Sequence, residues 1–267
     1  MPVSDAGAEW GREAQNLAEA LREAGKIALK TFRGEFRSWT KDHDSPVSEA
    51  DIAVDSFLRE RLSRPDAGWL SEESADDLTR LNYERLFIVD PIDGTRSYIA
   101  GREDWSIVAA FVEKGRPAAA AIYVPVLDEM YVASAGRGAT KNGVPVHVTG
   151  GAALQGARIA GPKSYLEHIQ KIAPEAVAIP KIHSLALRLA RVADGQIDAA
   201  FASVNARDWD LAAADLLVHE AGGALTGVSG EPLVYNLHNP VHGALIAAGR
   251  ARHETLISLI RTGKNFS

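Results

Sequence analysis

The first part of the chain repeats apolar residues every three or four positions, which is the spacing of one helix face. The positions that follow it are Leu17, Leu21, Ala24, Ala28 and Phe32. They predict an amphipathic helix over residues 8–32, ending at Gly34. A second helix is predicted after Ser48, with an apolar face formed by Val54, Phe57, Leu58 and Leu62.

Short apolar runs separated by turn signals follow these helices. Leu86–Val89 is typical of a buried strand that ends at Asp90, with the chain turning at Pro91. Four further runs predict an antiparallel meander. They cover residues 105–113, 118–127, 130–133 and 144–148.

After residue 150, strand-like and helix-like segments alternate, which is typical of α/β structure. Strands are predicted at 158–160, 177–179, 197–202, 224–225 and 244–248, and helices between Ser184 and Gly195, at 211–221 and at 253–261. Thr149-Gly150-Gly151 is the best linker. We therefore expect an N-terminal α+β domain over residues 1–150 and a C-terminal α/β domain over 151–267.

Composition narrows the function classes. The 267 residues are 46% hydrophobic and 24% charged, with a net charge of −6, which argues against binding to nucleic-acid polymers. The absence of cysteine excludes thiol chemistry. The longest apolar run, residues 118–127, is too short to span a bilayer, and the start lacks the features of a signal peptide. We expect a soluble, cytoplasmic protein without a membrane partner.

The segment Asp90-Pro91-Ile92-Asp93-Gly94-Thr95 carries the clearest chemistry. Two carboxylates and the Ile92 carbonyl aimed at one point would suit a hard divalent cation such as Mg²⁺. Free backbone amides after Gly94 would suit a phosphate if a helix starts there. A turn that caps a strand explains the same residues without any metal.

The positions of three other acidic residues can also be explained without a metal. Asp51 can complete a capping box with Ser48. Glu72 can end a strand, and Asp210 can stabilise a helix N-terminus.

Four blocks of the sequence resemble, in the same order, those of the inositol monophosphatase superfamily of Mg²⁺-dependent phosphomonoesterases. They are Ser45–Asp51, Leu70–Glu73, Asp90–Thr95, and Trp209–Ala214 with Glu220–Gly223. The resemblance implies a layered α/β/α/β/α sandwich, with an antiparallel N-terminal sheet and a smaller C-terminal α/β half. Homodimers are common in that superfamily.

The resemblance also implies roles for individual residues. Glu72, Asp90 and the Ile92 carbonyl would hold one Mg²⁺, and Asp90, Asp93 and Asp210 a second, with a third ion near Glu72 left open. Asp51, Glu72 and Thr95 would poise a metal-activated water for in-line attack. Contacts to the substrate are expected from Asp93, Gly94, Thr95, Arg96, Ser184, Leu185 and Asp210.

Two departures bear on the small phosphorylated substrate. Inositol monophosphatases commonly place an acid six residues before the second tryptophan block, where this chain has Ser203. Arg96 follows Thr95. In this respect the chain resembles the bacterial 3′(2′),5′-bisphosphate nucleotidase (CysQ-like) branch, which tends to have a basic residue at this position. The favoured reaction therefore converts 3′-phosphoadenosine 5′-phosphate to AMP. Inositol-1-monophosphatase, or a related sugar or histidinol phosphate phosphatase, is the alternative, and a non-catalytic metal- or phosphate-binding regulatory module is the remote one.

Overall fold

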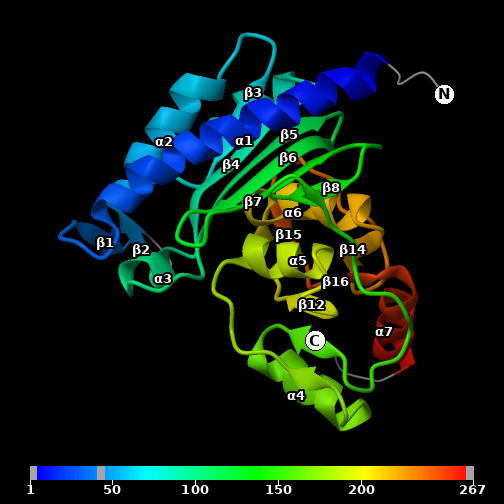
Figure 1. Cartoon of the computed structure of the whole chain (residues 1–267). Coiled ribbons are helices and arrows are strands. Elements are labelled where there is room, and N and C mark those ends of the chain that lie inside the picture. Colours follow the sequence, from blue (N-terminus) through cyan, green and yellow to red (C-terminus); the bar gives the residue numbers. More distant parts are fainter. Residues whose placement is uncertain (1–4, 41–45, 263–267) are drawn as a thin grey trace.

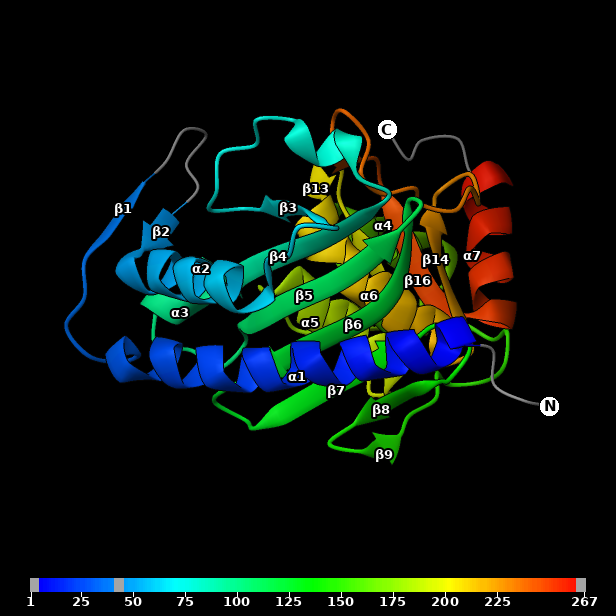
Figure 2. The same ribbon diagram turned by 90° about the horizontal axis from the view of Figure 1, so that it is seen from above.

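Two helices form the first layer of the molecule. The computed structural model describes residues 5–40 and 46–262, so Ser45 of the first matching block lies outside the described residues. Helices α1 (Asp5–Thr31) and α2 (Glu49–Leu62) lie side by side on one face of a seven-stranded sheet (Figure 1). Both helices cover the strands in the view from above as well (Figure 2).

The seven-stranded sheet has the order β3-β4-β5-β6-β7-β8-β9. Its strands are β3 (Gly68–Ser71), β4 (Arg85–Asp93), β5 (Ser106–Glu113), β6 (Arg116–Val124), β7 (Glu129–Ser134), β8 (Ala139–Lys141) and β9 (Val144–Pro145). Only β3 and β4 pair in parallel, so the predicted antiparallel meander is confirmed. The prediction missed β8 and made the last strand too long, because Asn142-Gly143 forms the turn between two very short strands.

Helices α5 (Leu185–Ala193) and α6 (Asp208–Glu220) form the central layer. They pack between the large sheet and a five-stranded sheet of order β11-β10-β12-β16-β14, and one apolar core runs through all three layers. The strands are β10 (Arg158–Ala160), β11 (Val177–Ala178), β12 (Ala199–Ala202), β14 (Gly223–Gly227) and β16 (Leu245–Gly249).

Helices α4 (Lys163–Ile172) and α7 (Arg250–Thr262) form the last layer, against the outer face of the small sheet (Figure 1). The five layers confirm the predicted α/β/α/β/α sandwich. The sequence pattern had not predicted α4, in which only Ile169 is buried. The division into domains at residue 150 stays a prediction.

Short elements complete the fold. They are the pairs β1 (Ser38–Thr40) with β2 (Pro46–Ser48) and β13 (Ala206–Arg207) with β15 (Val241–His242), the helix α3 (Thr95–Ile99) and the 3₁₀ turn η2 (Thr79–Asn82). None of the described helices combines the length and apolar character that crossing a membrane requires.

Candidate metal centre

An irregularity in β4 aims two carboxylates in one direction. Asp90 pairs with Val108 and Asp93 with Ser106, so three steps along β4 match two along β5. Side chains three positions apart on a regular strand point to opposite faces, and the extra residue of a bulge corrects this. The expected strand end at Asp90 was therefore wrong: β4 continues to Asp93, and Pro91 is tolerated because it lies in the bulge.

Asp210 reaches the same place from the central layer. Helix α6 starts at Asp208, three residues earlier than predicted, so Asp210 lies in its first turn. The amide of Arg207 donates to Asp210 Oδ2 at 2.7 Å, which fixes the carboxylate. Ligand oxygens of Asp90, Asp93 and Asp210 lie within 4.8 Å of one another, in the arrangement that a metal ion would need.

Asp93 is held by the N-terminus of α5. Its Oδ2 accepts hydrogen bonds from the Ser184 hydroxyl and the Ala186 amide, each at 2.7 Å, and its Oδ1 accepts from the Leu185 amide at 3.1 Å. Free amides and the helix dipole favour a negative charge at this position. The same carboxylate therefore anchors the central layer to the large sheet and faces the other two acids.

The electrostatics of the three acids call for a cation. Burial raises the pKa of Asp90 well above its usual range, and the negative charges of Glu72, Asp93 and Asp210 raise it further. Burial and the Asp93 charge raise the pKa of Asp210 to about 7. Bound divalent cations would remove this repulsion, so the residues present fit the metal that the sequence predicts.

Thr95 links the centre to α2. Its hydroxyl lies 3.1 Å from Asp51 Oδ1 and 3.0 Å from the Ile92 carbonyl oxygen. Asp51 Oδ2 accepts from the Ser48 amide at 2.8 Å, as the predicted capping box requires, and also from the Ser48 hydroxyl at 2.6 Å. Burial raises the pKa of Asp51, and these hydrogen bonds oppose that rise.

Gly94 provides the sharp turn between β4 and α3. Its φ is +93°, in the left-handed region that side chains disfavour. A Cβ there would lie 3.1 Å from both the Asp104 carbonyl oxygen and the Ser184 amide nitrogen. Glycine is therefore required where the site approaches α5.

A cavity of about 300 Å³ opens at the acid cluster. Its lining residues are Pro46, Glu72, Asp90, Asp93, Gly94, Thr95, Arg96, Lys181, His183 and Asp210. Ile92, Asp51 and Ser184 are buried behind this lining. The prediction missed Lys181, because a lysine in a loop carries no sequence signal for a site that forms only on folding.

A neighbouring cavity of about 630 Å³ shares Lys181 and His183 with the first one. It is lined by Gly161, Pro162, Lys163, Leu166, Ile179, Lys181, His183, Leu185, Arg188, Ala202 and Ser203. Leu185, a predicted substrate contact, therefore lines this cavity. None of the described lining residues is acidic.

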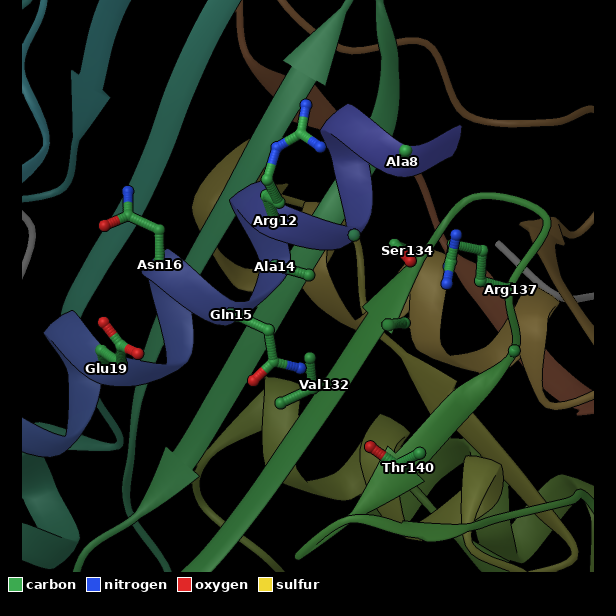
Figure 3. A pocket seen from close by; sticks show the side chains of 13 residues that line it. Ala8, Arg12, Ala14, Gln15, Asn16, Glu19, Val132, Ser134, Arg137 and Thr140 are labelled. Atoms are coloured by element: carbon green, nitrogen blue, oxygen red, sulfur yellow. The ribbon is translucent and has the colours of Figure 1, made fainter. Parts of the chain in front are cut away.

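A third hollow, of about 550 Å³, lies between α1 and strands β7 and β8 (Figure 3). It is far from the acids, because Thr31 at the other end of α1 contacts Tyr98 of α3 at 2.7 Å. A helix rises ~1.5 Å per residue, which places most of the hollow roughly 20 Å or more from that contact. Glu19 is the one acid among its described lining residues, so no metal site is indicated there.

The family model identifies the class of protein that has this fold and this carboxylate cluster. The model of the inositol monophosphatase family matches residues 12–264. The chain therefore belongs to this family, whose members are Mg²⁺-dependent phosphatases.

Three relatives illustrate how close the similarity is. The chain is 32% identical to an inositol-1-monophosphatase of Rhizobium meliloti, over 80% of this chain and 85% of that protein. It is 31% identical to a histidinol-phosphatase of Mycobacterium tuberculosis, over 92% and 96%. The structure of the extragenic suppressor protein suhB from Bartonella henselae is 28% identical, covers 93% of this chain and 98% of its own, and has a TM-score of 0.80.

Proposed function

We propose that the protein hydrolyses a small phosphate monoester whose leaving group carries a second anionic group. The first candidate reaction is that of a 3′(2′),5′-bisphosphate nucleotidase, which releases phosphate from 3′-phosphoadenosine 5′-phosphate to give AMP. The observation that carries this proposal is that a basic cavity lies beside the acid-lined one, with Lys181 and His183 lining both.

The acid-lined cavity would hold the phosphate to be cleaved. Glu72, Asp90 and the Ile92 carbonyl would bind one Mg²⁺, and Asp90, Asp93 and Asp210 a second, with Asp90 shared. Bound Mg²⁺ ions supply charge neutralisation and a more acidic water. A third ion near Glu72 belongs to the same proposal.

The chain's own groups would orient and deprotonate the nucleophile. Thr95 Oγ1 lies within hydrogen-bonding distance of Asp51 Oδ1, which fixes the direction in which its lone pairs face the cavity. Glu72 lines the cavity and would accept a proton from the attacking water. Gly94 also lines the cavity, where its amide is proposed to contact the phosphate.

The basic cavity would hold the rest of the substrate. Lys163, Lys181 and Arg188 provide three cations among its described lining residues. Lys163 also pairs with Glu167 at 3.7 Å, outside this lining, and the charges of Asp93 and Asp210 act on Arg188. Arg188 Nη1 donates to the Phe201 carbonyl at 3.0 Å, while its buried Nε has no hydrogen-bond partner. Cationic side chains in the wall of a cavity favour an anionic ligand. Arg96 adds a further positive charge at the mouth of the acid-lined cavity.

Inositol 1-phosphate is the second candidate substrate, because one relative is named an inositol-1-monophosphatase. A neutral polyol gains from a carboxylate that accepts its hydroxyl protons, and Ser203 occupies the corresponding place in the wall. Histidinol phosphate, suggested by another relative's name, carries a cationic amine that the basic residues would repel. Both substrates therefore rank below the bisphosphate.

A substrate panel tests the proposal. Phosphate release is measured at saturating Mg²⁺ with 3′-phosphoadenosine 5′-phosphate, inositol 1-phosphate and histidinol phosphate. We expect kcat/KM for the bisphosphate to exceed the others by at least ~10-fold, the gain from about 1.4 kcal/mol of extra binding. Faster cleavage of inositol 1-phosphate would refute the preference while leaving the phosphatase class intact.

A homodimer and a cytoplasmic location also belong to this proposal. Light scattering of the purified protein and fractionation of cells test them. A purely regulatory role would require that no member of the substrate panel releases phosphate with Mg²⁺.

A further inference from the structure

Helix α2 presents two carboxylates one turn apart on the same face. Asp51 faces Thr95, as described above. Asp55 faces a second segment: its Oδ1 accepts from the Ser71 hydroxyl at 2.5 Å and its Oδ2 from the Ser74 hydroxyl at 2.7 Å. One rigid helix therefore contacts both Thr95 and the segment that carries Glu72.

The segment after β3 is also held by backbone hydrogen bonds. Strand β3 ends at Ser71, and the Glu72 amide makes one more contact, 3.3 Å to the Val89 carbonyl of β4. The Glu73 amide donates back to Ser71 Oγ, also at 3.3 Å. Ser71 and Ser74, whose hydroxyls donate to Asp55, lie on either side of Glu72 and Glu73. The Asp55 carboxylate therefore holds both ends of this short segment.

A packing role alone does not explain why a carboxylate is buried at position 55. It is 7% exposed, and it forms no ion pair with any cation of the described residues. Burying a carboxylate without a cation costs stability, and hydroxyl donors only partly offset this. Apolar side chains at Asp55 and at the serines it contacts would avoid this cost.

We propose that Asp55 is a positioning residue that fixes Glu72 for metal binding. The inference rests on the proposed role of Glu72 as a metal ligand. Asp55 is not among the residues that line the acid-lined cavity, and it would act through the Ser71 and Ser74 hydroxyls. Loss of a partner that orients a ligand typically weakens metal affinity or activity by ~10–100-fold.

Thermal unfolding against Mg²⁺ concentration tests this without any substrate, because an ion that binds the folded state raises the melting temperature. The wild type is compared with Asp55→Ala and with Glu60→Ala, an exposed acid on the same helix. We expect Asp55→Ala to need at least ~10-fold more Mg²⁺ for the same rise, and Glu60→Ala to match the wild type.

The double variant Ser71→Ala/Ser74→Ala should show the same shift, and adding Asp55→Ala to it should cause little more, because all three act as one unit. This double variant decides the question if Asp55→Ala does not fold. A lower melting temperature with an unchanged Mg²⁺ requirement would overturn the proposal, because it shows a structural role only.

The result of this melting experiment can be distinguished from the result of the substrate panel that tests the proposed function. Wild-type protein that binds Mg²⁺ but cleaves no substrate of the panel would refute the function and still test Asp55. If the melting temperature of the wild type does not change with Mg²⁺, this result refutes the metal assignment and the role of Asp55 together.

Discussion

The Asp93 carboxylate accepts a 2.7 Å hydrogen bond from the Ser184 hydroxyl, although 91 positions separate the two residues. Ser184 in turn caps α5, since its Oγ accepts from the Leu187 amide at 2.9 Å. The acid that faces Asp90 and Asp210 is thus also the residue that ties the central helices to β4. Metal binding and the docking of α5 on the large sheet therefore depend on the same carboxylate.

Replacing Asp93 by asparagine should reduce turnover at least ~100-fold, since the variant loses a metal ligand and the charge beside Asp90. Far-ultraviolet circular dichroism should stay that of the folded protein, because the amide oxygen can still accept a hydrogen bond from α5. Asp77→Asn, in an exposed loop, is the matched control and should keep full turnover. Near-normal turnover of Asp93→Asn would contradict the assignment.

Removal of divalent cations should abolish phosphate release, and added Mg²⁺ should restore it. Without cations the acids repel one another, whereas bound Mg²⁺ at 100 times its dissociation constant would stabilise the fold by about 2.7 kcal/mol. The measurements are phosphate release and melting temperature in EDTA and after Mg²⁺ addition. A melting temperature that does not change with Mg²⁺ would count against the centre.

The stability of the metal-free protein should fall as the pH rises from about 4 to about 7. The pKa of Asp210 is raised from its ordinary 3.8 to about 7, so the folded state holds a proton that the unfolded state has lost in this range. Asp210→Asn removes this charge and should melt roughly 2–4 °C higher than the wild type in EDTA at pH 7.5. At pH 4 the two proteins should melt alike. Equal melting temperatures at both pH values would show that the carboxylate carries no electrostatic penalty.

Replacing Lys181 by methionine should lower the preference for a bisphosphate. The variant loses one cation of the basic cavity, so kcat/KM for 3′-phosphoadenosine 5′-phosphate should fall at least ~10-fold relative to that for inositol 1-phosphate. Lys171→Met, on the exposed side of α4, serves as the control. An equal fall for both substrates would place Lys181 at the cleaved phosphate alone.

Glycine 25 of α1 should resist substitution. A Cβ there would lie 2.5 Å from Cε1 of the buried Tyr123 ring, whose hydroxyl is held by Asp128 at 2.9 Å. Gly25→Ala should lower the free energy of unfolding by about 1–2 kcal/mol, since the steric cost exceeds the gain of about 1 kcal/mol in helix propensity.

Gly11→Ala on the same helix is the contrasting control. Its nearest neighbour would be Arg137 Nε at 3.4 Å, at the end of a flexible side chain (Figure 3). This variant should gain up to about 1 kcal/mol. Urea unfolding measures both, and a stabilised Gly25→Ala would show that the Tyr123 ring can move away.

Much of the fold was predictable from the sequence because the relevant signals are local. The helical spacing from Leu17 to Phe32 corresponds to α1, and the apolar runs between turn residues correspond to β5, β6 and β7. The motif around Asp90 and Asp93 and the tryptophan block with Asp210 identified the family, since several short patterns in one order are specific together.

Other features depend on contacts between distant segments, and only the tertiary structure could decide them. The bulge that aligns Asp90 with Asp93 arises from pairing with β5. Lys181 joins the cavity lining because the loop before α5 reaches the end of β4, and Asp55 contacts Ser71 because α2 lies beside the end of β3. The sequence determined which residue types carry the chemistry, because periodicity and motifs are properties of neighbouring residues. Packing between layers decided which of them meet, because that depends on contacts between segments far apart in the chain.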